Sequence, residues 1–211
     1  RDLHLSLRRQ RQMCIRDRNV VCLADDSHGV GGFGQTGRGT EEYTNCPPVD
    51  ILVGTLGKAF GVNGGYVVAN EATVRFLRES SQMYIYSNPI TVGEASAALA
   101  ALRIVDSPEG EALLENLRAL TKRFEDGLGR IGIETIPGEH PVVPLMIRDT
   151  AKTHHLVNHL YAHGVLVTGL AYPVVPRGDE EIRTQINADH TEADIDRVLN
   201  ILAESGIGRA H

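Results

Sequence analysis

Three short apolar runs rich in β-branched residues constrain the fold of this chain most. They cover residues 19–25, 50–55 and 65–70, and each is too short for a helix and ends at acidic residues, a threonine or an asparagine. Apolar side chains at helical spacing follow in residues 71–82, and residues 91–105 form a long Ala/Leu-rich helix. This succession predicts an α/β domain in which residues 19–25 form a buried strand.

The second half of the chain has a different order of elements. Ser107 and Pro108 are typical of a helix start, and the helix is expected to run to about Gly129. Its apolar stripe comprises Leu113, Leu114, Leu117, Leu120 and Phe124. The following pattern predicts a small α+β domain, with a strand at 142–147, a helix at 151–163, strands at 165–168 and 182–186, and a helix at 192–204. We therefore predict one domain over residues 19–107 and a second over residues 108–211.

Composition excludes several classes of protein. Lys and Arg number 21 against 27 Asp and Glu, so no basic surplus indicates nucleic acid or an anionic membrane as a partner. The apolar runs are too short to span a bilayer. Cys14, Cys22 and Cys46 form no disulfide framework, which favours reduced thiols in a cytosolic protein. Residues 1–18 are rich in arginine and similar to translated sequencing-adapter sequence, so we expect them to be foreign to the fold or disordered.

Two glycine-rich segments match nucleotide-binding motifs only in part. Residues 29–34 satisfy G-x-G-x-x-G after a strand, but more glycines follow where a dinucleotide fold needs a helix to open. Residues 54–58 end in Gly-Lys, but Leu52 and Ala59 occupy the positions where a phosphate loop needs glycine and Ser or Thr. The sequence therefore disfavours a dinucleotide site and excludes a Walker-type site.

Three histidines lie on one face of the helix expected at residues 151–163. His155, His159 and His163 are spaced four residues apart, which can converge on a metal ion. No Asp, Glu or Cys at matching spacing completes a ligand set, so a solvated helix face is the favoured interpretation and no metal site is predicted.

A third constellation fits one kind of chemistry. Asp25 ends a strand, His28 follows three residues later, and Lys58 follows the next strand with Thr55 three residues before it. Between Gly57 and Ala59 the lysine has little local charge to pair with, so it can be desolvated, which favours the neutral amine of Schiff-base chemistry. Catalysis with pyridoxal 5′-phosphate (PLP) needs such a lysine and an acid that keeps the pyridine nitrogen protonated. The residues alone leave this interpretation about even with a surface lysine and a turn aspartate.

Longer motifs resemble a known family. Residues 25–31, residues 54–59, and Thr168-Gly169 with residues 172–176 and 182–185 resemble the α-oxoamine synthases, over a match from about Asn19 to about the C-terminus. The resemblance implies the C-terminal part of a PLP-dependent transferase of fold type I, comprising part of the large mixed-sheet domain and the small domain. The YPVVP stretch at 172–176 favours the family branch that joins glycine to acetyl-CoA, releasing CoA.

The resemblance also implies roles for individual residues. Asp25 would pair with the pyridine nitrogen of PLP and His28 with its phenolic oxygen. Thr55 would contact the phosphate, and Lys58 would carry the cofactor and shuttle the α-proton of the substrate.

Further implied roles concern the substrate and a second subunit. Ser87 and Asn88 would lie near the phosphate of the partner subunit's cofactor, because family active sites form at the interface of a homodimer. Arg183 would bind the substrate carboxylate, for which the guanidinium fork is suited. The residues alone leave a plain strand-end arginine as the alternative.

The chain departs from the family in lacking its N-terminal half, which would supply the ring stacked on the cofactor, a phosphate loop and much of the CoA surface. A polypeptide of these 211 residues alone is therefore expected to show weak PLP catalysis or none. Another α-oxoamine synthase activity, a fold-type I aminotransferase and a non-catalytic fragment stay open as alternatives. The expected location is the cytoplasm, or the mitochondrion in a eukaryote.

Overall fold

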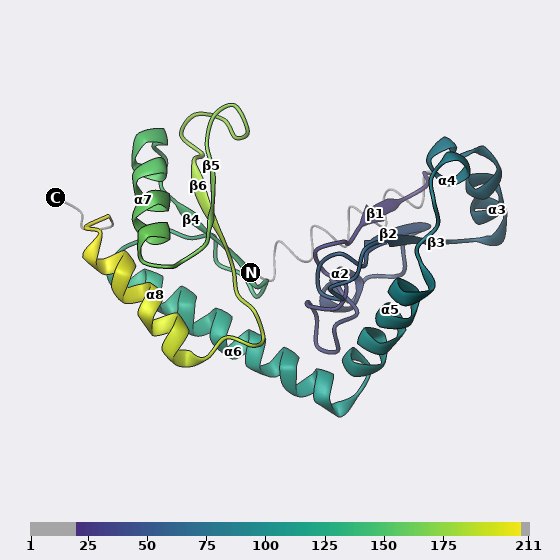
Figure 1. The fold of residues 1–211 in the computed structure, drawn as a ribbon, viewed down its shortest axis with the longest axis horizontal. Coiled ribbons are helices and arrows are strands. Elements are labelled where there is room, and N and C mark those ends of the chain that lie inside the picture. The colour runs from purple at the N-terminus through teal and green to yellow at the C-terminus, as the bar shows by residue number, and fades with distance from the viewer. Residues whose placement is uncertain (1–19, 208–211) are drawn as a thin grey trace. The chain divides into compact units, whose positions relative to one another are not determined.

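The structure is a computed structural model that describes residues 20–207, so the prediction for residues 1–18 lies outside the described residues. The chain divides into two compact units, with the boundary between Glu111 and Ala112. Figure 1 labels the helices and strands of each unit. None of the helices within residues 20–207 combines the length and the hydropathy that crossing a membrane requires.

Unit 1, which ends at Glu111, contains a three-stranded mixed sheet. Its strands are β1 (Leu23–Asp25), β2 (Ile51–Thr55) and β3 (Gly65–Ala69), in the order β1-β2-β3. β1 pairs parallel with β2, and β3 pairs antiparallel with β2. The mixed α/β architecture predicted from the sequence is confirmed.

The prediction that residues 19–25 form a buried strand is wrong in two respects. Regular strand geometry begins only at Leu23, and the side chains of Val20, Val21 and Leu23 are 50%, 67% and 60% exposed. The reason is position in the sheet, because among the described strands β1 pairs only with β2 and its other edge is open. Apolar composition alone does not tell a covered strand from an open edge.

The described part of unit 1 also contains the helices α2 (Thr40–Thr44), α3 (Glu71–Ser80), α4 (Gln82–Tyr86) and α5 (Val92–Val105). The single helix predicted over residues 71–82 ends at Ser80, because Ser81 has extended backbone angles and separates α3 from α4.

Local side-chain bonds fix where two of these helices begin. Asn70 accepts a hydrogen bond from the Thr73 amide at 2.9 Å at the start of α3. Thr91 and Glu94 form a reciprocal capping box at the start of α5. The helix predicted over residues 91–105 is therefore confirmed, with Thr91 as its N-cap.

The core of unit 1 is small. It joins Val30, Leu56, Phe60 and Ala98, which come from the loop after β1, the turn after β2 and helix α5. These four side chains pack the loop after β1 and the turn after β2 against helix α5.

Unit 2 contains an antiparallel sheet and three helices. The strands β4 (Val142–Met146), β6 (Glu181–Gln185) and β5 (Thr168–Leu170) lie in the order β4-β6-β5. The helices are α6 (Pro108–Ile131), which begins just before the boundary, α7 (Thr150–Ala162) and α8 (Glu192–Glu204). The elements expected from the sequence are all present in this half, although β5 is displaced.

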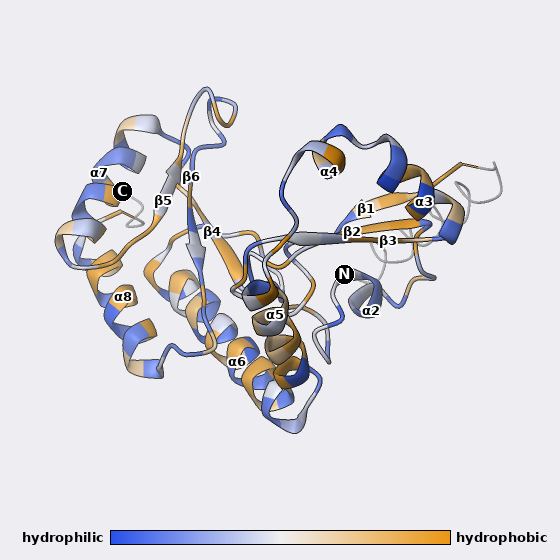
Figure 2. Cartoon of the chain, turned by 45° about the vertical axis from the view of Figure 1, so that its right-hand side comes forward, coloured by the Kyte–Doolittle hydropathy of each residue, from blue (hydrophilic) through white to orange (hydrophobic). Residues whose placement is uncertain are grey.

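Unit 2 buries a large core from all three helices and the sheet. Phe124, Leu145, Leu156, Ile182 and Leu202 are each at most 1% exposed and belong to one hydrophobic cluster. In Figure 2, α6 and α8 alternate hydrophobic and hydrophilic residues along their length, as expected for helices with one buried face.

Two details of the predicted second half are wrong. Leu113 of the expected stripe is 37% exposed, because it lies in the first turns of α6, outside the hydrophobic cluster. The strand expected at 165–168 instead begins at Thr168. Gly164 takes a positive φ of 77°, and the Val165 amide donates back to the Leu160 carbonyl of α7 at 2.9 Å. The hydrogen bond holds the segment after α7 against the end of that helix, so the chain joins the sheet only from Thr168.

Candidate functional site

Two predicted site residues end adjacent parallel strands. Asp25 is the last residue of β1 and Thr55 the last of β2, and Asp25 pairs in register with Val53. The carboxyl ends of parallel strands lie at one edge of the sheet, which is where open α/β sheets bind their ligands. The sheet therefore brings Asp25 and Thr55 to the same edge, and Lys58 follows three residues later.

The turn after β2 presents Lys58 between two buried anchors. Leu56 and Phe60 are each 7% exposed, whereas Lys58 is exposed. The turn is closed by the Gly61 amide, which donates to the Lys58 carbonyl at 3.0 Å, and by the Val62 amide, which donates to the Leu56 carbonyl at 2.8 Å. The prediction of a desolvated lysine is wrong for the described residues, because the anchors bury their own side chains and leave Lys58 uncovered.

Thr55 orders this turn with its hydroxyl. The hydroxyl donates to the Gly64 carbonyl at 3.2 Å and accepts from the Gly57 amide at 3.1 Å. A hydroxyl has a single hydrogen to donate, so a contact to a phosphate would require Thr55 to release Gly64. The hydroxyl thus holds the backbone on both sides of Lys58.

Asp25 is a stabilised carboxylate. Hydrogen bonds from Ser27, whose amide donates to the carboxylate at 3.0 Å, hold the pKa of Asp25 below its ordinary value, and the charges of Lys58 and His28 lower it further. Asp25 is therefore ionised at neutral pH. Because the charges of Lys58 and His28 both act on Asp25, three of the predicted site residues share one electrostatic environment.

Asp26, which is not among the predicted site residues, organises the loop after β1. Asp26 is 6% exposed and accepts hydrogen bonds from the Thr40 amide at 2.8 Å and the Thr40 hydroxyl at 2.5 Å. Gly39 has a positive φ of 84°, and a Cβ there would overlap the Asp26 carboxylate. The glycines around this loop are the sequence feature that could have indicated the burial of Asp26, since they allow the backbone to close around a buried acid.

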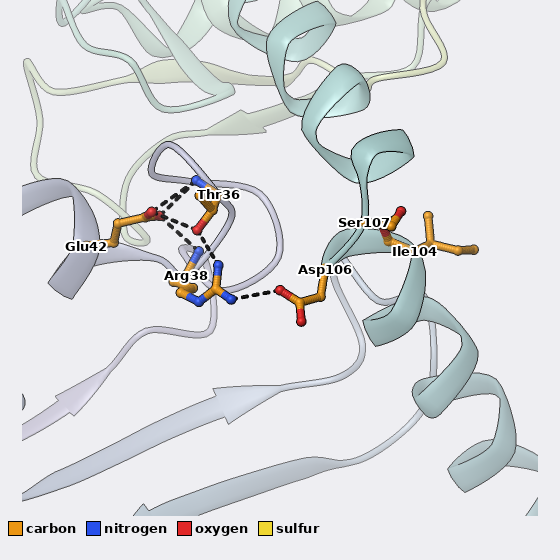
Figure 3. A network of polar contacts seen from close by, with 6 residues as sticks. All are labelled: Thr36, Arg38, Glu42, Ile104, Asp106 and Ser107. Atoms are coloured by element: carbon orange, nitrogen blue, oxygen red, sulfur yellow. Dashed lines mark hydrogen bonds and ion pairs between the residues drawn. The ribbon is translucent and has the colours of Figure 1, made fainter.

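A second polar cluster ties the same loop to its neighbours (Figure 3). Glu42 of α2 accepts from the Thr36 hydroxyl at 2.7 Å and from the amides of Thr36 and Arg38. Arg38 pairs with Asp106, the C-cap of α5, at 2.7 Å. The glycine-rich loop is therefore held in place by side-chain hydrogen bonds. The sequence analysis expected that no helix begins at residues 29–34, and the next helix does begin only at Thr40.

The loop and the Lys58 turn touch each other. Gly31 has a positive φ of 82°, and a Cβ on it would lie 2.8 Å from the Ala59 Cβ and 3.0 Å from the Phe60 ring. The turn that carries Lys58 and the loop that carries His28 are packed together at Gly31.

Ser87 and Asn88 lie elsewhere in unit 1. Ser87 is the C-cap of α4, its hydroxyl donates to the Met83 carbonyl, and both residues are exposed. Within residues 20–207 no hydrogen bond joins either of them to Asp25 or Lys58. Their role at a partner subunit's cofactor stays a prediction.

Arg183 lies in unit 2, at the centre of β6. Its cross-strand neighbours are Pro144 on β4 and Thr168 on β5. Ile182 and Thr184 on either side are buried, so Arg183 points to the open face of the sheet, where it is exposed. An exposed guanidinium fixed on a central strand suits the binding of a carboxylate.

The histidines of α7 form a stacked pair. The rings of His159 and His163 have centroids 4.4 Å apart, and His163 Nδ1 lies 2.7 Å from the His159 carbonyl oxygen. In the part of the chain that the structure describes, no group of three or more His, Cys, Asp or Glu side chains is placed to hold a metal ion.

Comparison with known proteins agrees with this fold. The aminotransferase class I and II family model matches residues 7–202. An 8-amino-7-oxononanoate synthase of Thioalkalivibrio sulfidiphilus is 40% identical over 87% of this chain and 47% of its own length. The 2-amino-3-ketobutyrate coenzyme A ligase of Escherichia coli K12 is 35% identical over 89% of this chain and 47% of its length. A solved structure of SPT with PLP superposes with a TM-score of 0.84 at 26% identity, over 91% of this chain and 48% of the other.

The fold is that of the PLP-dependent transferases. The chain belongs to the aminotransferase class I and II family, and the predicted resemblance to the α-oxoamine synthases is confirmed at the level of the family. The chain spans about half the length of the curated relatives it matches. Two relatives with different activities are similar to it at 40% and 35% identity, so the comparisons do not distinguish one member of the family.

The cofactor that these findings indicate is PLP, and the residues present fit it. An ionised carboxylate at the end of β1 suits a protonated pyridine nitrogen, and the exposed Lys58 on its anchored turn is accessible to a carbonyl carbon. Asp25 and the Lys58 turn follow adjacent parallel strands, so both groups lie at the edge of the sheet where such folds bind a ligand.

Proposed function

We propose that these residues belong to a PLP-dependent acyl-CoA:amino acid C-acyltransferase, a glycine C-acetyltransferase that converts glycine and acetyl-CoA to 2-amino-3-oxobutanoate and CoA. In cells the reverse direction would complete threonine breakdown. The observation that carries the proposal is the anchored turn of Lys58, which lies at the same sheet edge as the ionised Asp25. The chain is the C-terminal half of such an enzyme in this proposal.

When bound, PLP supplies an electron sink for a carbanion at the substrate α-carbon. Asp25 would keep a proton on the pyridine nitrogen, because its lowered pKa leaves it negatively charged at neutral pH. Lys58 would hold the cofactor, and its amine would take the α-proton of the substrate. His28 would hydrogen-bond the phenolic oxygen.

The remaining predicted residues bind charged groups. Thr55 would contact the phosphate with its hydroxyl on releasing the Gly64 carbonyl, and Ser87 and Asn88 would do so for the cofactor of the other subunit in a homodimer. Arg183 binds the substrate carboxylate from the open face of β6. The protein acts in the cytoplasm, or in the mitochondrion of a eukaryote, and needs neither a metal nor nucleic acid.

A second candidate activity is that of an 8-amino-7-oxononanoate synthase. It is favoured by the relative that is 40% identical, compared with 35% for the 2-amino-3-ketobutyrate coenzyme A ligase. The two names denote a nine-carbon and a four-carbon product, so the candidates differ in the length of the acyl group. A fold-type I aminotransferase would release no CoA at all, and a non-catalytic fragment would be inactive with every substrate.

Release of free CoA tests these alternatives. The 211-residue chain and the protein made from its reading frame extended upstream are each given PLP, one amino acid and one acyl-CoA. Glycine with acetyl-CoA is expected to release CoA with the extended protein, and to release little or none with the 211-residue chain. Preference for an acyl-CoA with a longer chain than acetyl-CoA would favour the second candidate. Amino-group transfer without CoA release would contradict both.

A further inference from the structure

The open face of β6 carries a carboxylate beside Arg183. Residues alternate along the strand, so that Ile182 and Thr184 are buried in the core while Glu181, Arg183 and Gln185 share the other face. Glu181 Oε1 lies 3.5 Å from Arg183 Nη2. The predicted substrate-binding guanidinium therefore has a negative partner two residues away on its own strand.

The carboxylate of this pair is held more firmly than the guanidinium. The Glu181 side chain is 15% exposed, whereas that of Arg183 is 49% exposed. Glu181 lies between Met146 on β4 and Leu170 on β5, its register partners, whose apolar side chains share its face of the sheet. Two apolar neighbours restrict the glutamate, so its charge stays close to Arg183 at little further entropic cost.

The preceding glutamate has a different task. Glu180 is 3% exposed, and its carboxylate accepts from the Thr150 hydroxyl at 3.0 Å and the Gly178 amide at 2.8 Å. Glu180 thus fastens the loop before β6 to the start of α7. Of the two adjacent glutamates, only Glu181 is directed to Arg183.

We propose that Glu181 is a built-in counter-ion that competes with carboxylate ligands for Arg183 and so weakens their binding. The proposal rests on the proposed function, in which Arg183 binds the substrate carboxylate. An incoming carboxylate must share the guanidinium with Glu181 or displace it. Glu181 is a positioning residue in this scheme. It orients the guanidinium of Arg183 and partly neutralises its charge, and it does not touch the reacting atoms.

Titration of the full chain with acetate measures this competition. The readout is the side-chain Nε–H resonance of Arg183 in a nitrogen–proton spectrum, assigned by its loss in Arg183→Gln, at constant ionic strength. The dissociation constant for acetate is expected to fall about two- to fivefold in Glu181→Gln, in keeping with the modest coupling of partly exposed ion pairs. Glu192→Gln is the matched control, because it removes one charge from α8, which packs on the buried face of the sheet.

The outcomes separate the two hypotheses. Tighter acetate binding in Glu181→Gln, with wild-type affinity in Glu192→Gln, supports the proposal. Equal affinity in Glu181→Gln and wild type overturns it, while a saturable shift of the Arg183 resonance would leave the carboxylate role of Arg183 standing. Acetate binding that persists in Arg183→Gln, followed on backbone amides of β6, would overturn that role as well as the proposal.

Discussion

The two units of this chain differ in how completely they cover their own hydrophobic residues. Unit 2 buries a cluster of 15 hydrophobic residues drawn from three helices and a sheet, whereas the buried cluster of unit 1 has four. In unit 1, Met83, Tyr86 and Val92 around α4 are 78%, 86% and 84% exposed, and Leu23 of β1 is 60% exposed. Unit 2 thus has the larger core, and its most exposed apolar side chains, such as Leu166 and Val174, lie mainly in loops, whereas the described part of unit 1 exposes apolar side chains on its strands and helices.

The described residues of unit 1 build only part of the candidate site. Unit 1 orders the loop of Asp25 and His28 and the turn of Lys58 with its small core and with the hydrogen bonds that Asp26 and Glu42 accept. The same unit leaves Lys58 uncovered. The described residues therefore order the segments that carry the predicted site residues, and none of them covers Lys58.

The largest expected effect comes from opening the core of unit 2. Phe124 is 1% exposed, so Phe124→Ala should lower the free energy of unfolding of unit 2 by about 3–5 kcal/mol through lost burial and a cavity. Urea unfolding followed by amide hydrogen exchange in β4 and β6 measures the loss. Leu166→Ala, at an 87% exposed position, is the control and should change it by less than about 0.5 kcal/mol. A loss below about 1 kcal/mol in Phe124→Ala would mean that the core of unit 2 is not packed as described.

A smaller effect is expected in the loop of unit 1. Gly39→Ala should destabilise it by about 1–3 kcal/mol, because alanine is strained at a φ of 84° and its Cβ would overlap the Asp26 carboxylate. Faster amide exchange over residues 26–40 is the measurement. At Gly32 an added Cβ would meet only the Ala59 Cβ at 3.9 Å, so Gly32→Ala should leave exchange nearly unchanged. Similar exchange rates in both variants would show that Asp26 does not organise the loop.

The smallest effect is a pH dependence in unit 2. Arg123 donates to Asp196 at 2.9 and 2.7 Å, and these bonds lower the pKa of Asp196 in the folded state. The resulting stability is present above the ordinary aspartate pKa of about 4 and is lost as the pH falls through the lowered value. Asp196→Asn should therefore lose less stability than wild type between pH 7 and pH 3, as measured by the urea midpoint of unit 2. Equal losses would contradict this assignment.

Elements with local signals could be predicted from the sequence. Helix α8 has the predicted bounds of 192–204, because Thr191 and Asp194 form a capping box before an amphipathic run. The Ala/Leu-rich run of α5 and the helix start at Pro108 were predictable for the same reason. Arg183 lies on a central strand with its neighbours buried, as the alternation of residues 182–186 indicates.

Features that depend on distant residues could not be predicted. The five-residue helix α2 is held in a glycine-rich stretch by Glu42, whose partners Thr36 and Arg38 precede the helix. The burial of Asp26 depends on Thr40, 14 residues away. The exposure of β1 and of Lys58 depends on which other segments pack over them, and the local sequence does not show which segments do so.

The attachment site of PLP tests the central claim most directly. Lys58 is one of three lysines in the sequence, with Lys122 and Lys152 in unit 2. The protein from the upstream-extended reading frame and the 211-residue chain are incubated with PLP, reduced with borohydride and mapped by peptide mass spectrometry. We expect the extended protein to carry PLP on Lys58 and to lose it in Lys58→Ala, and we expect the 211-residue chain to be labelled far less. PLP on another lysine in place of Lys58 would contradict the central claim.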